Sequence, residues 1–330
     1  MAVAAAGGAG GDATVRRVRL GLLLGFGAYA CWGLLSPVGK HLLDSLPPLG
    51  MNAARFVLAM LVLLPALGPH AALQSIRLLR HRGLLWANLL ANVSLTCFLF
   101  ALDRLQPTEA TLLFYSAPLW TAAWAHVRLR EHVGWPFLPA AAGLIAGGYL
   151  ALFGVAGDGI PRADPAGLLL ALASAVLWAF YTVALRRVAP GIAVRPLMGN
   201  SFVAGSIYFA LLALAVEGLP PVGRLDAAGW GWMALYVAVP TVGSFALFVA
   251  AVRLAPAGQV NILIAAELAF TALFAAILFG DRFAPAQLAG LALTIVAVAG
   301  YLAWRSRKPP ADDAARAVMH GGTPPGPAAP

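Results

Sequence analysis

The stretch "RLAPAGQVNILIAAELAFTA", from Arg253 to Ala272, matches an earlier stretch, "RLQPTEATLLFYSAPLWTA", from Arg104 to Ala122, with a gap of one residue. Both stretches begin with Arg-Leu, pass a proline, continue through a mostly apolar segment and end in Thr-Ala. Similarity at a fixed distance along a chain indicates an internal structural repeat. The fold must therefore be one that uses a similar unit twice.

The composition indicates that this protein lies in a lipid bilayer. Of the 330 residues, 61% are hydrophobic and 11% are charged, whereas a soluble domain has about half apolar and about a quarter charged residues. Apolar runs of about 20 residues are long enough to cross a bilayer as helices. We therefore predict an all-α polytopic membrane protein with ten transmembrane helices, at roughly 18–38, 48–67, 83–102, 108–127, 134–154, 166–186, 196–216, 229–251, 257–279 and 285–304.

The basic residues predict the orientation. With the N-terminus in the cytoplasm, sixteen Lys and Arg residues fall on the inner side of the ten spans and five on the outer side. This positive-inside bias supports cytoplasmic N- and C-termini. The net charge of +9 is explained by these loops, because no basic soluble domain suited to nucleic acid is present.

A second match supports the repeat. "AYACWG", starting at Ala28, aligns with "SAVLWAF", starting at Ser174, so that Trp32 corresponds to Trp178. Each half has five spans, and an odd number makes the second half enter the membrane from the opposite side. Inverted repeats place a substrate site near the bilayer midplane, between the halves. We expect a disordered tail at 1–15, repeats at 16–156 and 157–305, and a second disordered tail at 306–330.

Several short motifs, taken in order, carry a family resemblance. "ACWG", "LPPLGMNAARF", "SAPLWTA…LRE" and "AELAFTALFAAILFGD" resemble the EamA-type members of the drug/metabolite transporter superfamily, over about residues 19–304. The resemblance implies a ten-helix carrier for small metabolites, amino acids or toxic compounds, usually in a bacterial inner membrane. The family often has Glu-Pro in the ninth span, but here Leu268 follows Glu267. A hinge at that proline is therefore not expected.

Glu267 is the leading candidate functional residue. It lies about 15 Å into a span that starts near Ala257, and a charge at that depth costs about 2.5–3.5 kcal/mol on insertion scales. Three interpretations remain open. Glu267 couples transport to protons, because burial favours a neutral carboxyl group; it binds a cationic or amine-bearing substrate; or it only hydrogen-bonds a neighbouring helix. Thr271 lies one turn further along the same face.

Arg55 is the other ionisable residue within a span, about 10 Å from its outer end at Pro48. We expect its side chain to extend outward to the lipid headgroups, or to form a structural pair within the protein. Contact with an anionic group of the substrate is the alternative.

Neutral polar and aromatic side chains recur at helical spacing in several spans. For any one of them, a hydrogen bond between helices is the favoured interpretation. The tryptophans that correspond between the repeats are expected to line the cavity, where an aromatic wall suits planar or cationic solutes. The candidates of this kind for substrate binding or coupling are Tyr29, Trp32, Asn92, Tyr115 and Trp178.

Other functions find less support. "VGSFA", at Val242, lacks the flanking glycines of a nucleophilic serine motif, and neither a zinc-ligand spacing nor a phosphate-binding glycine loop occurs. We therefore expect no enzyme, no metal and no cofactor. A membrane receptor or structural protein remains the alternative to a carrier, which is favoured by the repeat. Small residues in "GLIAGG" and "GLALTIVAVAG" indicate close helix packing, either between the fifth and tenth spans or at a homodimer contact.

Overall fold

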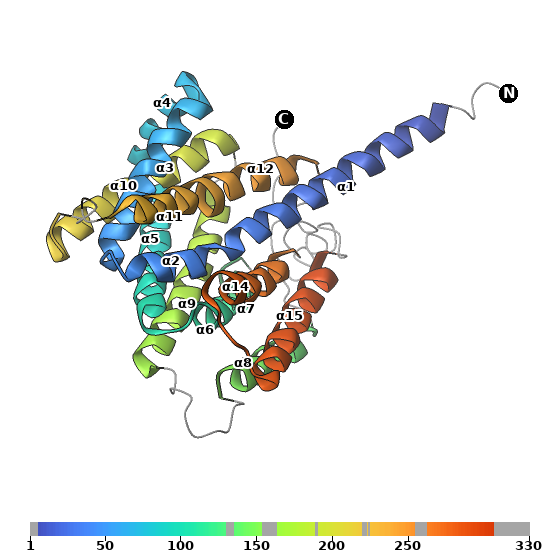
Figure 1. Ribbon diagram of the computed structural model, residues 1–330. Helices are drawn as coiled ribbons and strands as arrows, with labels where there is room; N and C mark the ends of the chain where they lie inside the picture. Colours follow the sequence, from blue (N-terminus) through green and yellow to red (C-terminus); the bar gives the residue numbers. More distant parts are fainter. Residues whose placement is uncertain are drawn as a thin grey trace.

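The computed structural model describes residues 6–129, 135–153, 164–188, 191–219, 223, 225–254 and 263–306 (Figure 1). Every regular element in these ranges is a helix, which confirms the all-α prediction for the described residues. The elements are α1 Ala6–Gly33, α2 Leu35–Leu43, α3 Pro48–Leu67, α4 Pro69–Arg77, η1 Leu78–Arg80, α5 Arg82–Arg104, α6 Pro107–Phe114, α7 Ala117–Leu129, α8 Phe137–Phe153, α9 Pro165–Val188, α10 Val194–Val216, α11 Ala227–Val237, η3 Ala238–Gly243, α12 Ser244–Leu254, α14 Ile264–Phe279 and α15 Pro285–Ser306.

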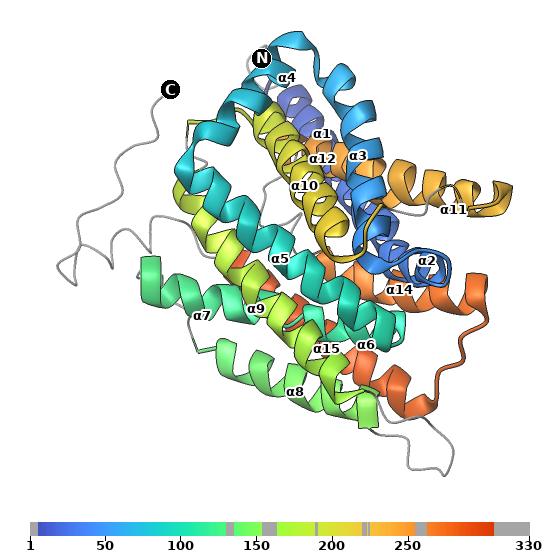
Figure 2. The same cartoon turned by 90° about the vertical axis from the view of Figure 1, so that its left-hand side faces the viewer.

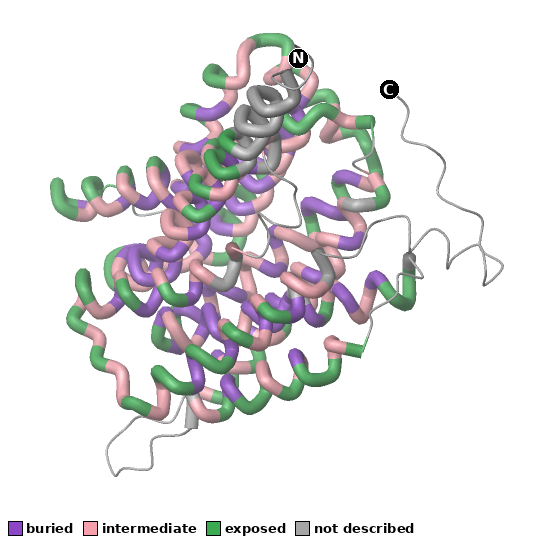
Figure 3. Tube along the Cα trace, turned by 90° about the vertical axis from the view of Figure 1, so that its right-hand side faces the viewer, coloured by how far each residue is buried: buried purple, intermediate pink, exposed green. Residues whose placement is uncertain are grey.

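The described helices are those of an integral membrane protein. Six stretches are long and apolar enough to cross a bilayer: 19–43, 48–67, 82–104, 165–185, 194–216 and 227–248. Large apolar side chains such as Leu61, Leu211 and Ile277 are exposed on the outer faces of the helices, where lipid rather than water would meet them. Figure 3 shows exposed residues on the outer turns and buried residues on the inner ones. The expected count of ten spans is not confirmed by these six.

Several expected spans are interrupted within the described residues. The first consists of α1 and α2, and the fourth consists of α6 and α7, with Tyr115 and Ser116 between them. In the eighth, the π-helical η3 joins α11 to α12. Pro240 has no N–H to complete the ladder, and the Thr241 hydroxyl donates to the carbonyl of Tyr236, 2.8 Å away. The α1 helix begins at Ala6, within the expected N-terminal tail, whereas the expected C-terminal tail lies almost wholly outside the described residues.

The pairing of helices follows the repeat. The α5 helix, in the third span, packs along α9, in the sixth. The α1 helix, in the first span, packs along α12, in the eighth. These two contacts are equivalent, because exchanging the halves converts one into the other. Two other contacts join spans at equivalent positions in the two halves: α3 packs against α10 (second and seventh spans), and α8 packs against α15 (fifth and tenth spans). Figure 2 shows α5 beside α9, and α3 beside α10. This pairing is the two-repeat architecture that the sequence predicts.

Small residues allow the closest of these approaches. A Cβ on Gly143 would lie 2.7 Å from the Cβ of Ala297, and one on Gly147 would lie 2.5 Å from the hydroxyl of Thr294. The glycine pattern of the fifth span is thus explained by its packing against the tenth. Gly33 likewise allows α1 to approach α14 closely, because a Cβ added to Gly33 would lie 2.5 Å from the Cβ of Phe270.

Candidate functional site

Glu267 lies in the first turn of α14, and its side chain is half-buried. The expected start of this span, near Ala257, lies outside the described residues, and α14 itself begins at Ile264. Twelve residues separate Glu267 from the end of the helix at Phe279, a rise of about 18 Å. A carboxylate in the first turn also faces the positive end of the helix dipole.

Side chains from both halves of the chain surround this carboxyl group. Tyr29 of α1 and Tyr115, in the break between α6 and α7, both lie within electrostatic reach of Glu267. The Tyr115 hydroxyl is buried beside the carboxyl group, but it makes no hydrogen bond with good geometry among the described residues. The hydroxyl of Thr271 is likewise buried and unpaired there. We call Tyr29, Tyr115, Glu267 and Thr271 the Glu267 cluster.

The surroundings of the Glu267 cluster are mostly apolar. Tyr115 packs with Leu112, Leu268 and Leu291 in one buried group. One turn before Tyr115, the hydroxyl of Thr111 lies 2.7 Å from that of Ser36, in a hydrogen bond between α6 and α2. Thr111 thus ties α6 to α2, whereas the Tyr115 hydroxyl, in the break after α6, is buried and makes no hydrogen bond among the described residues.

The two corresponding tryptophans lie in separate aromatic groups. Trp32 contacts Tyr29, with ring centroids 5.1 Å apart, and also packs on Phe248 of α12. Trp178 of α9 packs on Phe114 and Tyr181, at 5.8 and 4.9 Å. The structure thus brings Trp32 next to the Glu267 cluster through Tyr29. Among the described contacts, Trp178 approaches the cluster through Phe114, the neighbour of Tyr115 in sequence.

Arg55 does not extend to the lipid headgroups, and that expectation is wrong. Its side chain is 6% exposed, and Nε donates to the Thr241 hydroxyl at 2.8 Å. Nη1 donates to Oδ1 of Asn52 at 3.4 Å. The reason is that α3 packs against α10, α11 and η3, which cover the guanidinium before it could reach the outer end. The alternative expectation, a pairing within the protein, describes these contacts.

The polar stripe on α5 joins helices. Asn88 donates to Oδ1 of Asn200 on α10 at 2.8 Å, and the Thr96 hydroxyl lies 3.3 Å from that of Tyr208. Asn92, between them, is buried on the same helix. None of the contacts described for this stripe includes a residue of the Glu267 cluster. Asn88 and Thr96 thus make the interhelical bonds favoured by their spacing, and Asn92 is not brought to the cluster.

Two residues of this interior have roles that the sequence analysis did not identify. Asn52 accepts from Arg55, and its position three residues earlier on one helix face was the available signal. Glu217, at the end of α10, accepts from the backbone N–H groups of Leu49 and Gly50 at 3.0 and 2.7 Å. It caps α3 from 167 residues away in sequence, a distance that no local pattern indicates.

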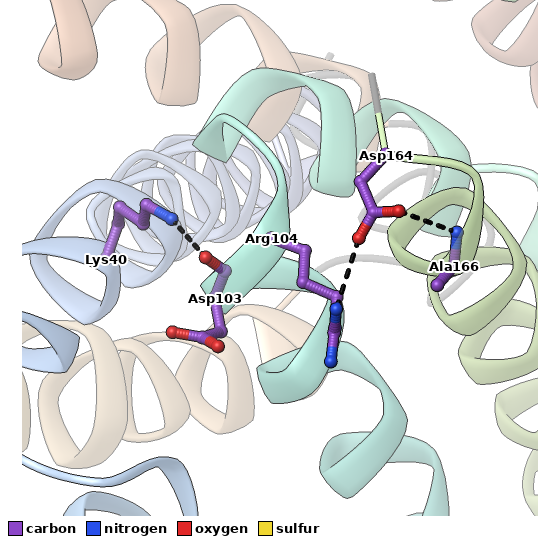
Figure 4. Close-up of polar contacts among 5 residues, drawn as sticks. All are labelled: Lys40, Asp103, Arg104, Asp164 and Ala166. Atoms are coloured by element: carbon purple, nitrogen blue, oxygen red, sulfur yellow. Dashed lines mark hydrogen bonds and ion pairs between the residues drawn. The ribbon is translucent and has the colours of Figure 1, made fainter. Parts of the chain in front are cut away.

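The polar contacts at one end of the bundle join the ends of α2, α5 and α9 (Figure 4). Nζ of Lys40 donates to the backbone carbonyl of Asp103 at 2.6 Å. The neighbouring Arg104 pairs with Asp164 at 3.3 Å, and Asp164 accepts from the N–H of Ala166 at 3.1 Å, which caps α9. Among the described residues, no group of three His, Cys, Asp or Glu side chains could hold a metal ion.

Comparison with known proteins identifies the architecture. A solved structure titled "Crystal structure of protein" aligns with a TM-score of 0.58 and 21% identity, covering 87% of this chain and 99% of that one. At this identity the likeness concerns the fold alone. No curated protein matches the chain. The sequence profile of the EamA-like transporter family matches residues 19–153 and again 165–303. Two adjacent matches that cover most of the helices show that the chain belongs to the EamA-like transporter family.

Proposed function

We propose that this protein is a secondary carrier, in which two inverted repeats rock around the Glu267 cluster and expose it alternately to each side of the membrane. The cargo is a small organic metabolite or a toxic compound. The repeats span residues 16–156 and 157–305. The protein lies in a bacterial inner membrane, with both termini in the cytoplasm. The observation that carries the proposal is the Glu267 cluster itself, which combines residues of both family matches.

The chemistry of the cluster favours a proton or a cationic group as its ligand. Glu267 supplies the negative charge, and the unpaired hydroxyls of Tyr115 and Thr271 are buried. Hydroxyls both donate and accept hydrogen bonds, so they can serve the carboxylate, the carboxylic acid or a bound amine in turn. Trp32, held against Tyr29 at 5.1 Å, adds an aromatic face for a cationic solute.

Transport in proteoliposomes tests the proposal. A panel of radiolabelled metabolites is screened for counterflow, and then for accumulation driven by a pH gradient. The Glu267→Gln variant should lose accumulation under the gradient by at least about tenfold, since the amide cannot exchange a proton. If protons are the coupling ion, the variant should retain counterflow, which needs no net proton movement.

A matched acid-to-amide change provides the control. Asp44 is exposed, and among the described residues its carboxylate makes one weak contact, 3.9 Å from His41, so Asp44→Asn should transport as the wild type does. Loss of counterflow in Glu267→Gln with unchanged folding would favour cationic substrate binding over proton coupling. Saturable transport of no solute by the wild type would overturn the carrier proposal in favour of a receptor or structural role.

A further inference from the structure

The surroundings of Arg55 contain only neutral groups in the described part of the chain. Its guanidinium contacts the Thr241 hydroxyl and the Asn52 carbonyl oxygen at 2.8 and 3.4 Å. It also lies over the rings of Tyr236 and Phe56, at 4.9 and 5.4 Å from their centroids. Two ion pairs occur among the described residues, His41–Asp44 and Arg104–Asp164, and neither includes Arg55.

A guanidinium in this position needs a counter-charge. Arginine is effectively always protonated in proteins, and a buried charge without an opposite partner is strongly unfavourable. The partner hydroxyl of Thr241 already donates to the Tyr236 carbonyl at 2.8 Å, so it offers only a lone pair. The bonds to Thr241 and Asn52 use two of the five N–H donors of the guanidinium, and the neutral hydroxyl of Tyr236 also lies within hydrogen-bonding reach.

A second donor beside Arg55 also lacks an acceptor. Asn52 has no exposed surface, and its Oδ1 is the atom that accepts from Arg55. Its Nδ2, on the same amide group, makes no hydrogen bond among the described residues. Buried polar atoms are nearly always paired, and an unpaired one indicates a ligand or water. Two neighbouring groups that can only donate here, one of them charged, match an anion.

The fold holds these donors rigidly. Arg55 and Asn52 lie three residues apart on α3, and Thr241 lies on the π-helical η3 that Pro240 introduces. Single π-helical turns occur often at functional sites. Gly39 of α2 brings the backbone to the Tyr236 hydroxyl, which would lie 3.0 Å from an added Cβ. Residues from both family matches therefore surround Arg55, as they do Glu267.

We propose that Arg55 and Asn52 form a binding site for a small monovalent anion, either a halide or the carboxylate group of a solute. The site goes beyond the carrier function, since an anion can bind there whether or not the chain transports solutes. Its charge is opposite to that of the Glu267 cluster, and none of the described hydrogen bonds runs directly between the two sites.

Thermal unfolding of the purified full-length protein in neutral detergent tests the site. Sodium isethionate, a bulky and weakly accepting salt, is replaced by chloride or by acetate at constant pH and ionic strength. A ligand that binds only the folded state raises the Tm. We expect an increase of about 2–5 °C at anion concentrations far above Kd. An increase in chloride alone identifies a halide site, and an increase in acetate identifies a carboxylate site.

Two variants separate binding from general salt effects. Asn52→Asp places a carboxylate beside Arg55, so this variant should lose the anion dependence and be at least as stable as the wild type in isethionate. Asn88→Asp is the control, because the Asn88 amide is already paired with Asn200 at 2.8 Å. It should lower the Tm and retain the anion-dependent increase.

The proposal is overturned if the wild-type Tm is the same in all three salts, or if Asn52→Asp shows the full wild-type increase. Should Asn52→Asp not fold, Arg55→Gln serves instead, and it must also abolish the increase. Counterflow measured on the same preparations keeps the two hypotheses apart. An anion-dependent Tm without transport of any solute supports the anion site and counts against the carrier.

Discussion

At the scale of single residues, the interior contains two ionisable groups in contrasting settings. Glu267 lies beside hydroxyl groups that have no hydrogen-bond partner in the described part of the chain, whereas Arg55 donates to Thr241 and Asn52. The sequence indicated both residues, because a charge inside an apolar run is visible without a structure. It could not distinguish their surroundings, which come from helices far apart in the chain. The sequence did not indicate Asn52 for the same reason, because only its contact with Arg55 distinguishes this amide from others.

The Tyr115 hydroxyl yields a prediction at this scale. Tyr115→Phe removes a buried oxygen that has no hydrogen-bond partner among the described residues. The Tm should therefore change by no more than a few degrees, because an unpaired buried hydroxyl contributes little stability. Counterflow activity should fall by about tenfold, the effect of losing one hydrogen bond that the hydroxyl makes to a proton or solute only during transport. Wild-type transport in this variant would mean that Tyr115 only packs.

At the scale of elements, prolines and glycines set the helix ends that the sequence predicted. Pro48, Pro107, Pro165 and Pro285 each begin a helix, and Gly280, with φ of 74°, ends α14. The interruptions inside spans were not foreseen. A hydropathy average over about 20 residues does not resolve one or two residues, so it did not reveal the breaks at Leu34, Tyr115 and Pro240.

Two contacts of Asp164 can be separated by mutation (Figure 4). Arg104→Ala removes an exposed ion pair and should cost at most about 1 kcal/mol. Asp164→Ala also removes the cap on the Ala166 N–H and should cost about 1 kcal/mol more. The two Tm values, measured side by side, check the order. Equal losses would show that the cap contributes nothing.

The close approach of α1 to α14 depends on Gly33. Gly33→Ala forces a methyl group to within 2.5 Å of the Phe270 Cβ, and such overpacking costs about 1–3 kcal/mol. Because the same contact positions Glu267, transport should fall together with the Tm. Gly300→Ala on α15, where nothing lies within 4 Å of the added carbon, should leave both properties at wild-type values. If Gly33→Ala matched this control, the packing argument would fail.

At the scale of the whole molecule, polar contacts join segments that are expected on the same side of the membrane. Lys40 and Asp103 meet at one end, as do Glu217 and Leu49, and all four lie at or beyond span ends that are expected outside. Arg187 donates to the Arg128 carbonyl at 2.7 Å, between loops expected inside. Contacts of this kind agree with the order of the spans. They do not distinguish the cytoplasmic face, for which the charge bias of the loops is the argument.

Chemical labelling of single introduced cysteines tests which face of the protein is cytoplasmic. In a chain without Cys31 and Cys97, His70→Cys and Ala228→Cys place exposed thiols on loops expected inside and outside, respectively. A membrane-impermeant thiol reagent should label Ala228→Cys on intact cells and His70→Cys only after permeabilisation. Labelling of both thiols in permeabilised cells confirms that each is reactive. The reverse pattern on intact cells would place the N-terminus outside.

The sequence by itself determined the membrane setting, the repeat, the family resemblance and the identity of Glu267 and Arg55. Each of these follows from composition, spacing or a charge in an apolar run, which are local properties of the chain. Only the tertiary structure decided which partners those charges have. Tyr115 reaches Glu267 and Thr241 reaches Arg55 across more than 150 residues, because helices of one repeat pack against helices of the other. The energy of a buried charge depends on the groups within a few ångströms, and folding, rather than sequence distance, selects those groups.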